Sequence, residues 1–165
     1  MDPVHFTGKE VLDMAVRIEE NGVRFYTDAA RASSSNAIKA LFDVLAEEEG
    51  HHIKVFLDLK RTLPEDENSS EGFDPYWDEA SQYLKALADT EVFTTPEDGG
   101  KLAGKMHNER EVVEVAIGME KDSLLFYYEM EKMIREKDRH ILESLIEQEK
   151  DHLKKLTELL GAITG

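Results

Sequence analysis

The segment Glu49-Gly50-His51-His52 combines a carboxylate and an imidazole at a spacing that strongly constrains how this chain can fold. On a helix, Glu49 and His52 are three residues apart and therefore project from the same face. Burying an isolated carboxylate is costly, so a carboxylate on an apolar face needs a partner in the interior. The helical neighbours of Glu49 are apolar and point to such an interior: Phe42, Leu45, Ala46, Ile53 and Phe56.

A second copy of this motif, Glu149-Lys150-Asp151-His152, lies one hundred residues further along the chain. Other pieces repeat with it. Ala15–Glu19 matches Ala116–Glu120 at an offset of 101, and Phe25-Tyr26 matches Phe126-Tyr127 at the same offset. The one-residue difference falls in a hairpin loop, where insertions are tolerated. The chain is therefore interpreted as two similar helical hairpins.

Apolar residues recur at helical spacing in four long segments, which predicts four helices. Thr7–Glu10 has the spacing of a capping box and opens the first helix, which ends at the Ser33–Asn36 turn. The second helix ends near Leu63-Pro64, because proline cannot continue a helix. Asn108 opens the third helix, and a break near Lys137-Asp138 separates the third from the fourth.

The segment between the second and third helices, residues 64–108, differs in character. Two polar stretches, Glu65–Gly72 and Thr94–Gly100, flank a predicted short helix within Pro75–Ala88. A connection of this length is too long for a plain helical hairpin and suits a crossover along the side of a bundle. The sequence therefore predicts an all-α chain with one domain over residues 1–165. The fold would be a four-helix bundle of two antiparallel hairpins joined by a long crossover that contains the short helix.

The repeat identifies two further inward carboxylates, Glu19 and Glu120, whose helical neighbours are mainly apolar. Four carboxylates and two neutral imidazoles then carry a summed charge of −4, which two divalent ions would neutralise. Glutamate and histidine ligands without thiolate suit iron, manganese or zinc, and carboxylates can bridge two metals. The predicted metal ligands, which act in catalysis through the metals, are Glu19, Glu49, His52, Glu120, Glu149 and His152.

Composition excludes several classes of function. The formal charge is −16, from 36 acidic and 20 basic residues. Such a surface repels nucleic acid and anionic lipid; it either attracts cations or simply keeps the protein in solution. The sequence has no run of 18 uncharged apolar residues and no secretory pattern at its start, so we expect no membrane span and a cytoplasmic location. It has no cysteine, which excludes thiolate ligands.

These motifs resemble those of the rubrerythrin family within the ferritin-like superfamily. The resemblance covers all four helices and rests on Glu19, Glu49-x-x-His52, Glu120 and Glu149-x-x-His152. It implies a ferritin-like bundle with two metal ions, iron being expected and manganese or zinc being alternatives. It also implies that the glutamates of the two Glu-x-x-His motifs serve one metal each or bridge both. Each histidine would bind one metal, and the remaining two glutamates would complete the coordination.

Two features depart from the family pattern. Rubrerythrins carry an extra glutamate one turn beyond the third-helix ligand, where this chain has Ser123, so redox-linked ligand switching is not expected. They also carry a cysteine-rich rubredoxin module that supplies electrons. Because this sequence has no cysteine, the resemblance implies that a separate protein donates electrons.

Tyr26 and Tyr127 are secondary candidates because they lie seven residues after Glu19 and Glu120, on the same helix faces. Each tyrosine either donates a hydrogen bond to a ligand carboxylate or is a core residue whose hydroxyl bonds elsewhere. The small residues Gly22 and Ser123 either leave room for an exogenous ligand or permit close packing. Tyr128 is a candidate by resemblance alone. Surface positions are predicted for the remaining polar candidates, which are His5, His51, His107, His140 and Asp151.

Three functions follow from this interpretation. The resemblance favours a di-iron oxidoreductase that reduces hydrogen peroxide, or alternatively dioxygen, in oxidative-stress defence. The second is ferritin-like iron oxidation and handling, although the sequence shows no shell-forming surface for storage. The third is a non-enzymatic bundle held together by metal, or an acidic interaction module. The resemblance also implies a homodimer, with hairpin exchange through the crossover as one form.

Overall fold

The computed structural model describes residues 8–63, 79, 82–84, 86 and 108–165. Within these residues the chain is helical and contains no strand. The elements in chain order are α1 (Gly8–Ala32), α2 (Asn36–Arg61), α5 (Glu109–Met133), the short 3-10 helix η1 (Glu136–Asp138) and α6 (Arg139–Thr164). None of the described helices is long and apolar enough to cross a membrane.

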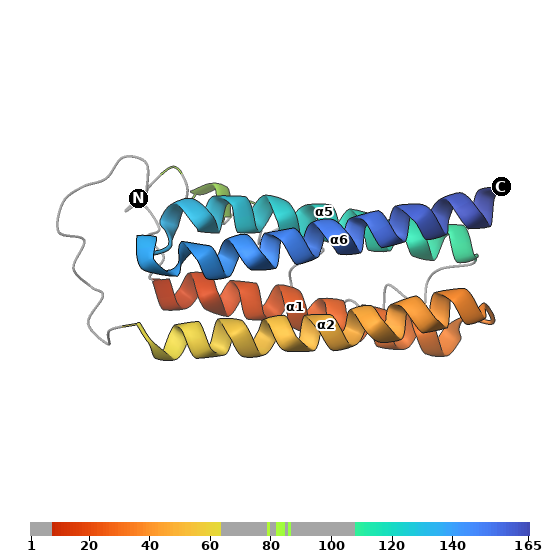
Figure 1. Cartoon of the computed structure of the whole chain (residues 1–165), viewed down its shortest axis with the longest axis horizontal. Coiled ribbons are helices and arrows are strands. Elements are labelled where there is room, and N and C mark those ends of the chain that lie inside the picture. Colours follow the sequence, from red (N-terminus) through yellow and green to blue (C-terminus); the bar gives the residue numbers. More distant parts are fainter. Residues whose placement is uncertain (1–7, 64–78, 80–81, 85, 87–107) are drawn as a thin grey trace.

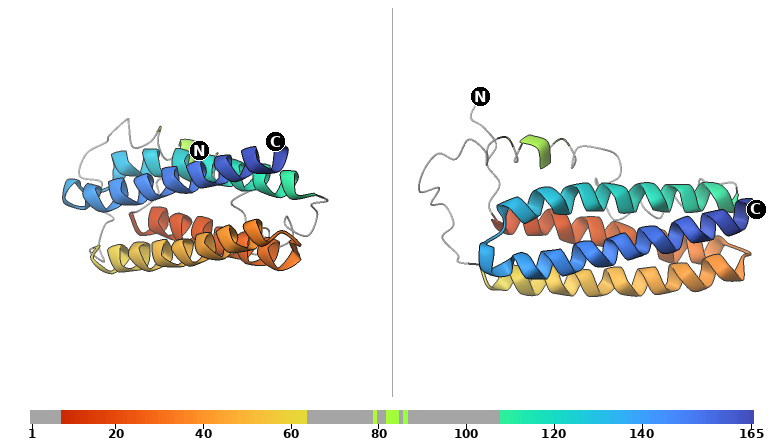
Figure 2. Two further views of the ribbon diagram at one scale, coloured as in Figure 1. Left: turned by 45° about the vertical axis from the view of Figure 1, so that its right-hand side comes forward. Right: turned by 45° about the horizontal axis from the view of Figure 1, so that its top comes forward.

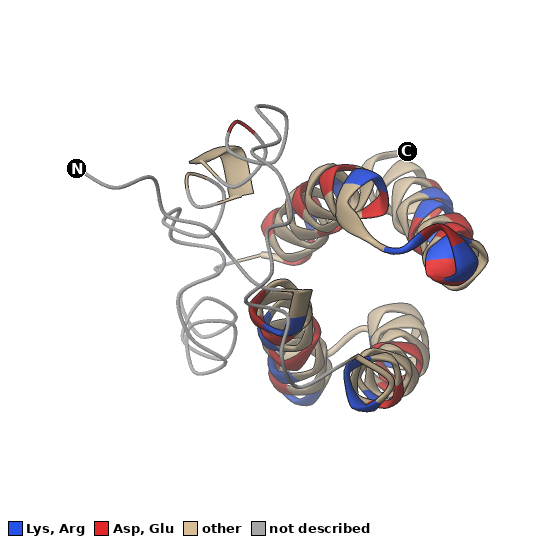
Figure 3. Ribbon diagram, turned by 90° about the vertical axis from the view of Figure 1, so that its left-hand side faces the viewer, with Lys and Arg blue, Asp and Glu red and all other residues tan. Residues whose placement is uncertain are grey.

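The long helices form two antiparallel hairpins. α1 packs most extensively against α2, and α5 against α6, so each hairpin is made of helices adjacent in sequence (Figure 1). The two views of Figure 2 show the hairpins lying along each other over most of their length. Viewed from one end, the four helices stand as two pairs around a shared interior (Figure 3). The predicted four-helix bundle is thus confirmed.

Within the described residues, the helix boundaries agree with the capping residues and the break that the sequence predicted. The Ser35 side chain caps α2 by accepting a hydrogen bond from the Ile38 amide, and Asn108 caps α5 in the same way through Glu111. η1 forms the predicted break before α6. Thr7 of the expected capping box lies outside the described residues, as does most of the crossover. Five residues of the predicted short helix are described and are helical: Glu79, Gln82, Tyr83, Leu84 and Ala86.

The core is divided into two apolar clusters along the bundle axis. On α1, for example, Val11 to Ile18 belong to one cluster and Phe25 to Ala30 belong to the other. α2 crosses in the opposite direction, from Ile38–Leu45 in the second cluster to Phe56–Leu63 in the first. α5 and α6 divide in the same manner. The six predicted ligands occupy the level between the clusters, so hydrocarbon lies above and below them.

Candidate metal centre

All six predicted ligands meet in the middle of the bundle, and none is more than 3% exposed. Each long helix contributes at least one of them, since the three-residue spacing places the Glu and His of each motif on one inward face. Because four carboxylates face one another in an apolar interior, their charges require compensation there.

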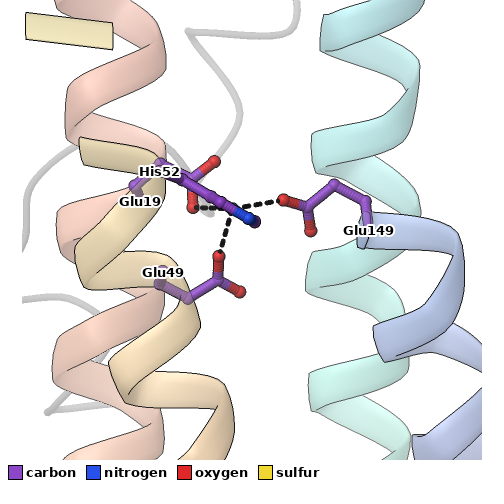
Figure 4. Close-up of side chains that lie close together, drawn as sticks. All are labelled: Glu19, Glu49, His52 and Glu149. Atoms are coloured by element: carbon purple, nitrogen blue, oxygen red, sulfur yellow. Dashed lines mark ion pairs between the residues drawn. The ribbon is translucent and has the colours of Figure 1, made fainter. Parts of the chain in front are cut away.

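The first half of the cluster surrounds His52 (Figure 4). Its Nδ1 atom lies 2.7 Å from Glu149 Oε1, 2.9 Å from Glu49 Oε2 and 3.6 Å from Glu19 Oε2. These carboxylates come from three different helices and both hairpins. One imidazole nitrogen carries at most one proton, so it cannot donate a hydrogen bond to all three oxygens.

The second half repeats this arrangement around His152. Its Nδ1 atom lies 3.4 Å from Glu49 Oε1, 3.4 Å from Glu149 Oε2 and 3.7 Å from Glu120 Oε2. The two imidazole rings are stacked, with centroids 5.6 Å apart. Glu49 and Glu149 therefore present one oxygen to each histidine.

The donor atoms form two overlapping groups that fit two metal ions. The first group contains Glu19 and His52, the second contains Glu120 and His152, and Glu49 and Glu149 belong to both. Within each group the candidate ligand atoms lie within 4.8 Å of one another. Carboxylate oxygens and imidazole nitrogens are donors that iron, manganese and zinc accept.

Unsatisfied atoms support this fit. Glu49 Oε2, Glu149 Oε1 and both histidine Nδ1 atoms are buried and have no hydrogen-bond partner with acceptable geometry. Buried polar atoms in folded proteins nearly always have a partner. Their concentration at one place, facing one another, is what a site for cations requires.

Two tyrosines hold Glu19 and Glu120, the outer glutamates that each belong to only one donor group, in place. The Tyr26 hydroxyl donates a hydrogen bond to Glu120 Oε1, and the Tyr127 hydroxyl donates one to Glu19 Oε1. Each bond crosses from one hairpin to the other, so each tyrosine contacts the glutamate of the opposite hairpin. The Oε2 atom of each glutamate is left facing a histidine. Outer partners of this kind hold a ligand in its binding orientation.

Removal of one such hydroxyl should weaken metal binding. We expect Tyr127→Phe to lower the affinity of the site for Co(II) about tenfold, because the Glu19 carboxylate then loses its fixed orientation. A competition titration against a coloured chelator measures this. Tyr128→Phe is the matched control, since Tyr128 is 40% exposed and lies beneath the Lys150 ammonium group. An affinity equal to that of the control would show that the hydrogen bond does not position the ligand.

Burial and like charge set the ionisation of the carboxylates. Desolvation raises the pKa of Glu49, and the charges of Glu149, Glu19 and Glu120 raise it further. Desolvation, with the charge of Glu149, raises the pKa of Glu120 to about 7. Burial acts to raise the pKa of Glu149 as well. Its contacts with the two histidines outweigh burial, so the pKa of Glu149 lies below its ordinary value.

Burial and the neighbouring charges also shift the pKa values of the histidines and tyrosines in the cluster. Burial acts to lower the pKa of His52 and His152, but the surrounding carboxylates outweigh it and raise both pKa values well above the ordinary range. Desolvation raises the pKa of Tyr26 and Tyr127, and the adjacent glutamates add to the effect. Both tyrosines therefore keep their protons and remain hydrogen-bond donors.

The metal-free protein should become less stable as the pH rises from about 4.5 to about 7. The pKa of Glu120 rises from 4.5 in the unfolded chain to about 7 in the folded one. The folded state therefore binds the proton more tightly, and about 3 kcal/mol of stability present below pH 4.5 is lost by about pH 7. The raised pKa of Glu49 also lowers the stability as the pH rises. The raised pKa values of the two histidines extend this loss of stability above pH 6.5. The lowered pKa of Glu149 acts oppositely, but only below 4.5.

Urea unfolding in the presence of a chelator, at several pH values across this window, measures the effect. Glu120→Gln is the control variant, because it has no proton to gain at this position; its profile should be shallower, and the slope that remains comes from Glu49 and the histidines. A free energy of unfolding that stays constant or rises between these pH values would contradict the account.

Two residues that were not predicted from the sequence contact the Nε2 atoms of the histidines. Glu48 Oε2 lies 2.9 Å from His152 Nε2, and the Gln148 side-chain oxygen forms a 3.3 Å hydrogen bond with His52 Nε2. Each residue immediately precedes a ligand glutamate and contacts the histidine of the opposite hairpin. Glu48 and Gln148 occupy equivalent positions in the repeat, at an offset of 100, and this equivalence could have identified them from the sequence.

The other candidates lie away from the cluster or outside the described residues. His51, Asp151 and His140 are exposed, and Asp151 pairs with Lys155 at 3.0 Å. His5 and His107 lie outside the described residues.

A small pocket opens beside the cluster, between α1 and α5. Gly22 and Ser123, which occupy equivalent places in the repeat, both line it. A side chain at Gly22 would meet Glu49, because an added Cβ would lie 3.4 Å from Glu49 Cγ. The small residues therefore leave space next to the ligands. The remaining lining residues are Ile18, Glu19, Asn21, Tyr26, Glu49, Met119 and Glu120.

Comparisons with known proteins agree with this geometry. The family model described as Rubrerythrin matches residues 10–160. The chain is also similar to a crystal structure described as that of a proposed ferritin-like diiron-carboxylate protein from Thermotoga maritima. The identity is 29%, the TM-score is 0.71, and the match covers 94% of this chain and 95% of that one. A search of curated proteins gave no match.

Proposed function

Because this chain belongs to the rubrerythrin family, we propose that its buried cluster binds two iron ions and that the protein reduces hydrogen peroxide to water. The observation that supports this most strongly is the pair of overlapping donor groups that share Glu49 and Glu149. A shared pair of carboxylates is suited to holding two metals roughly 3.5–4 Å apart. The chemistry supplied by two bound iron ions is the transfer of two electrons, which with two protons reduce one hydrogen peroxide molecule to two water molecules.

The residues of the chain would hold and shield this centre. Glu49 and Glu149 would bind both metals, while each histidine Nδ1 and each outer glutamate would bind one. The Tyr26 and Tyr127 hydroxyls donate hydrogen bonds to the Oε1 atoms of Glu120 and Glu19, which keeps these carboxylates from turning. The two apolar clusters exclude bulk water from both ends of the site.

The size and position of the pocket between α1 and α5 favour a small substrate. It is lined by the ligands Glu19, Glu49 and Glu120 and by the small residues Gly22 and Ser123, so a molecule inside it lies next to the donor atoms. Hydrogen peroxide and dioxygen are of a size to enter; a large organic substrate is not. We propose that electrons come from a donor outside residues 1–165.

Anaerobic loading with Fe(II), followed by rapid mixing with hydrogen peroxide or with dioxygen, tests the proposal. We expect oxidation of the iron to be faster with peroxide. Faster oxidation by dioxygen with many irons retained per chain would instead favour ferritin-like iron handling. No reaction with either oxidant would favour a metal that only stabilises the bundle. His51→Ala and His52→Ala form a matched pair, since only His52 lies in the cluster and only its loss should slow the reaction.

Filling the pocket should slow peroxide reduction without destabilising the protein. Gly22→Ala places a methyl group against Glu49, at van der Waals distance, where the substrate is expected to lie. At the same time alanine favours a helix over glycine by up to about 1 kcal/mol. We therefore expect a several-fold lower turnover rate together with an unchanged or higher melting temperature.

Gly118→Ala is the matched control for this substitution. Gly118 is also inside a helix, but an added Cβ there meets nothing within 4 Å. Equal turnover in the two variants would show that the pocket is not the route of the substrate.

A further inference from the structure

The two halves of the cluster are nearly equivalent, except at the outer nitrogens of the histidines. Each half has one tyrosine-bound glutamate, one histidine and the shared pair Glu49 and Glu149. The residue behind His152 is the carboxylate Glu48, whereas the residue behind His52 is the neutral amide Gln148. We propose that Glu48 and Gln148 make the two metal positions unequal, so that the position beside His152 binds metal first and more tightly. This inference rests on the proposed dinuclear site.

Glu48 is well placed to act on His152. Its Oε2 atom lies 2.9 Å from His152 Nε2, and its side chain is about one-third exposed. Lys155 Nζ lies 3.6 Å from the same oxygen and 3.0 Å from Asp151, so the lysine is shared between two carboxylates. Both atoms of this 2.9 Å contact, Glu48 Oε2 and His152 Nε2, are buried, and neither has a hydrogen-bond partner of acceptable geometry among the described residues, so the two are available to each other.

Gln148 contacts Nε2 of His52 as Glu48 contacts Nε2 of His152, but its neutral amide oxygen is a weaker hydrogen-bond acceptor than a carboxylate. Its side-chain oxygen is 3.3 Å from His52 Nε2, and its side-chain nitrogen donates to the Ser144 carbonyl. This second bond orients the amide with its oxygen toward the histidine. Gln148 is exposed, so water competes for the contact.

The difference acts through the imidazole ring. When Nδ1 binds a metal, Nε2 carries the proton and donates it in a hydrogen bond. An ionised acceptor forms a hydrogen bond roughly twice as strong as a neutral one and makes the ring a better metal donor. Glu48 therefore strengthens His152 as a ligand and adds negative charge on its side. Glu48 and Gln148 are positioning residues, since neither touches the metal itself.

Cobalt(II) loading tests this without any measurement of turnover. The metal-free protein is crystallised with one equivalent of Co(II), and anomalous scattering gives the occupancy at each position. We expect the position beside His152 to be occupied about three- to tenfold more than the position beside His52, because outer partners change metal affinity roughly 10–100-fold and one equivalent shared by two sites divides by about the square root of that ratio. The charge-swapped variant Glu48→Gln with Gln148→Glu keeps the net charge and should reverse the preference.

A titration in solution supplies the second measurement. The visible absorption of bound Co(II) should appear in two phases for the natural sequence, and the phases should merge in Glu48→Gln. Glu47→Gln is the control, because it removes the same charge from an exposed neighbouring position and should leave both phases unchanged.

The outcomes separate this inference from the proposed function. Two bound cobalt ions with equal occupancy, or a preference that the charge swap does not change, would overturn the inference and leave the dinuclear site standing. Binding of fewer than two cobalt ions at saturation would overturn both.

Discussion

Replacing Glu49 by alanine should abolish peroxide reduction and reduce metal binding from two ions to at most one per chain. Glu49 belongs to both donor groups, with Oε2 2.9 Å from His52 Nδ1 and Oε1 3.4 Å from His152 Nδ1. Its loss therefore removes a ligand from both positions. The rate should fall by more than the roughly 10–100-fold that loss of an outer partner costs a metal site. Metal analysis and peroxide-dependent oxidation of Fe(II) measure the two effects.

Two variants make this result interpretable. Glu47→Ala removes an exposed carboxylate from the same helix and should change neither quantity. Glu19→Ala removes a ligand from one donor group only, so it should lose the metal beside His52 and retain the other. If Glu49→Ala keeps two metals and normal turnover, the cluster is not the centre of the chemistry.

Removal of metal should lower the melting temperature by about 10 °C. A ligand present at about 1,000 times its dissociation constant stabilises the folded state by about 4 kcal/mol, and each kcal/mol moves the melting temperature of a domain of this size by about 2–4 °C. The physical reason is that without metal the buried carboxylates repel one another or take up protons. Thermal unfolding followed by circular dichroism, with Fe(II) under anaerobic conditions and with a chelator, measures the shift.

The double variant Glu49→Gln with Glu149→Gln provides the control. It removes both shared carboxylates, so its melting temperature should not respond to metal. Its metal-free form should be at least as stable as that of the natural sequence, because two like charges have left the interior. Equal melting temperatures of the natural protein with and without metal would contradict the prediction.

The sequence was sufficient to predict the bundle and the six central residues, because helical spacing determines which side chains share a face. Glu49 and His52 are three apart among apolar neighbours, and the repeat then points to Glu19 and Glu120. The structure places all of them in one buried cluster. The helix caps Ser35 and Asn108 also followed from local chemistry.

Contacts between hairpins could not be predicted in the same way. The position of Tyr26 fixes its own helix face, but only the packing of α1 against α5 shows that its partner is Glu120. Glu48 and Gln148 lie at the edge of an inward face, where spacing does not separate a solvent contact from a contact across the bundle. The pocket beside Gly22 likewise depends on how closely two helices approach.

The most direct test is a crystal structure of the iron-loaded protein with data collected on both sides of the iron absorption edge. We expect two anomalous peaks roughly 3.5–4 Å apart, both between Glu49 and Glu149, with one beside His52 and the other beside His152. No peak at this level of the bundle, or iron found only on the acidic surface, would contradict this prediction.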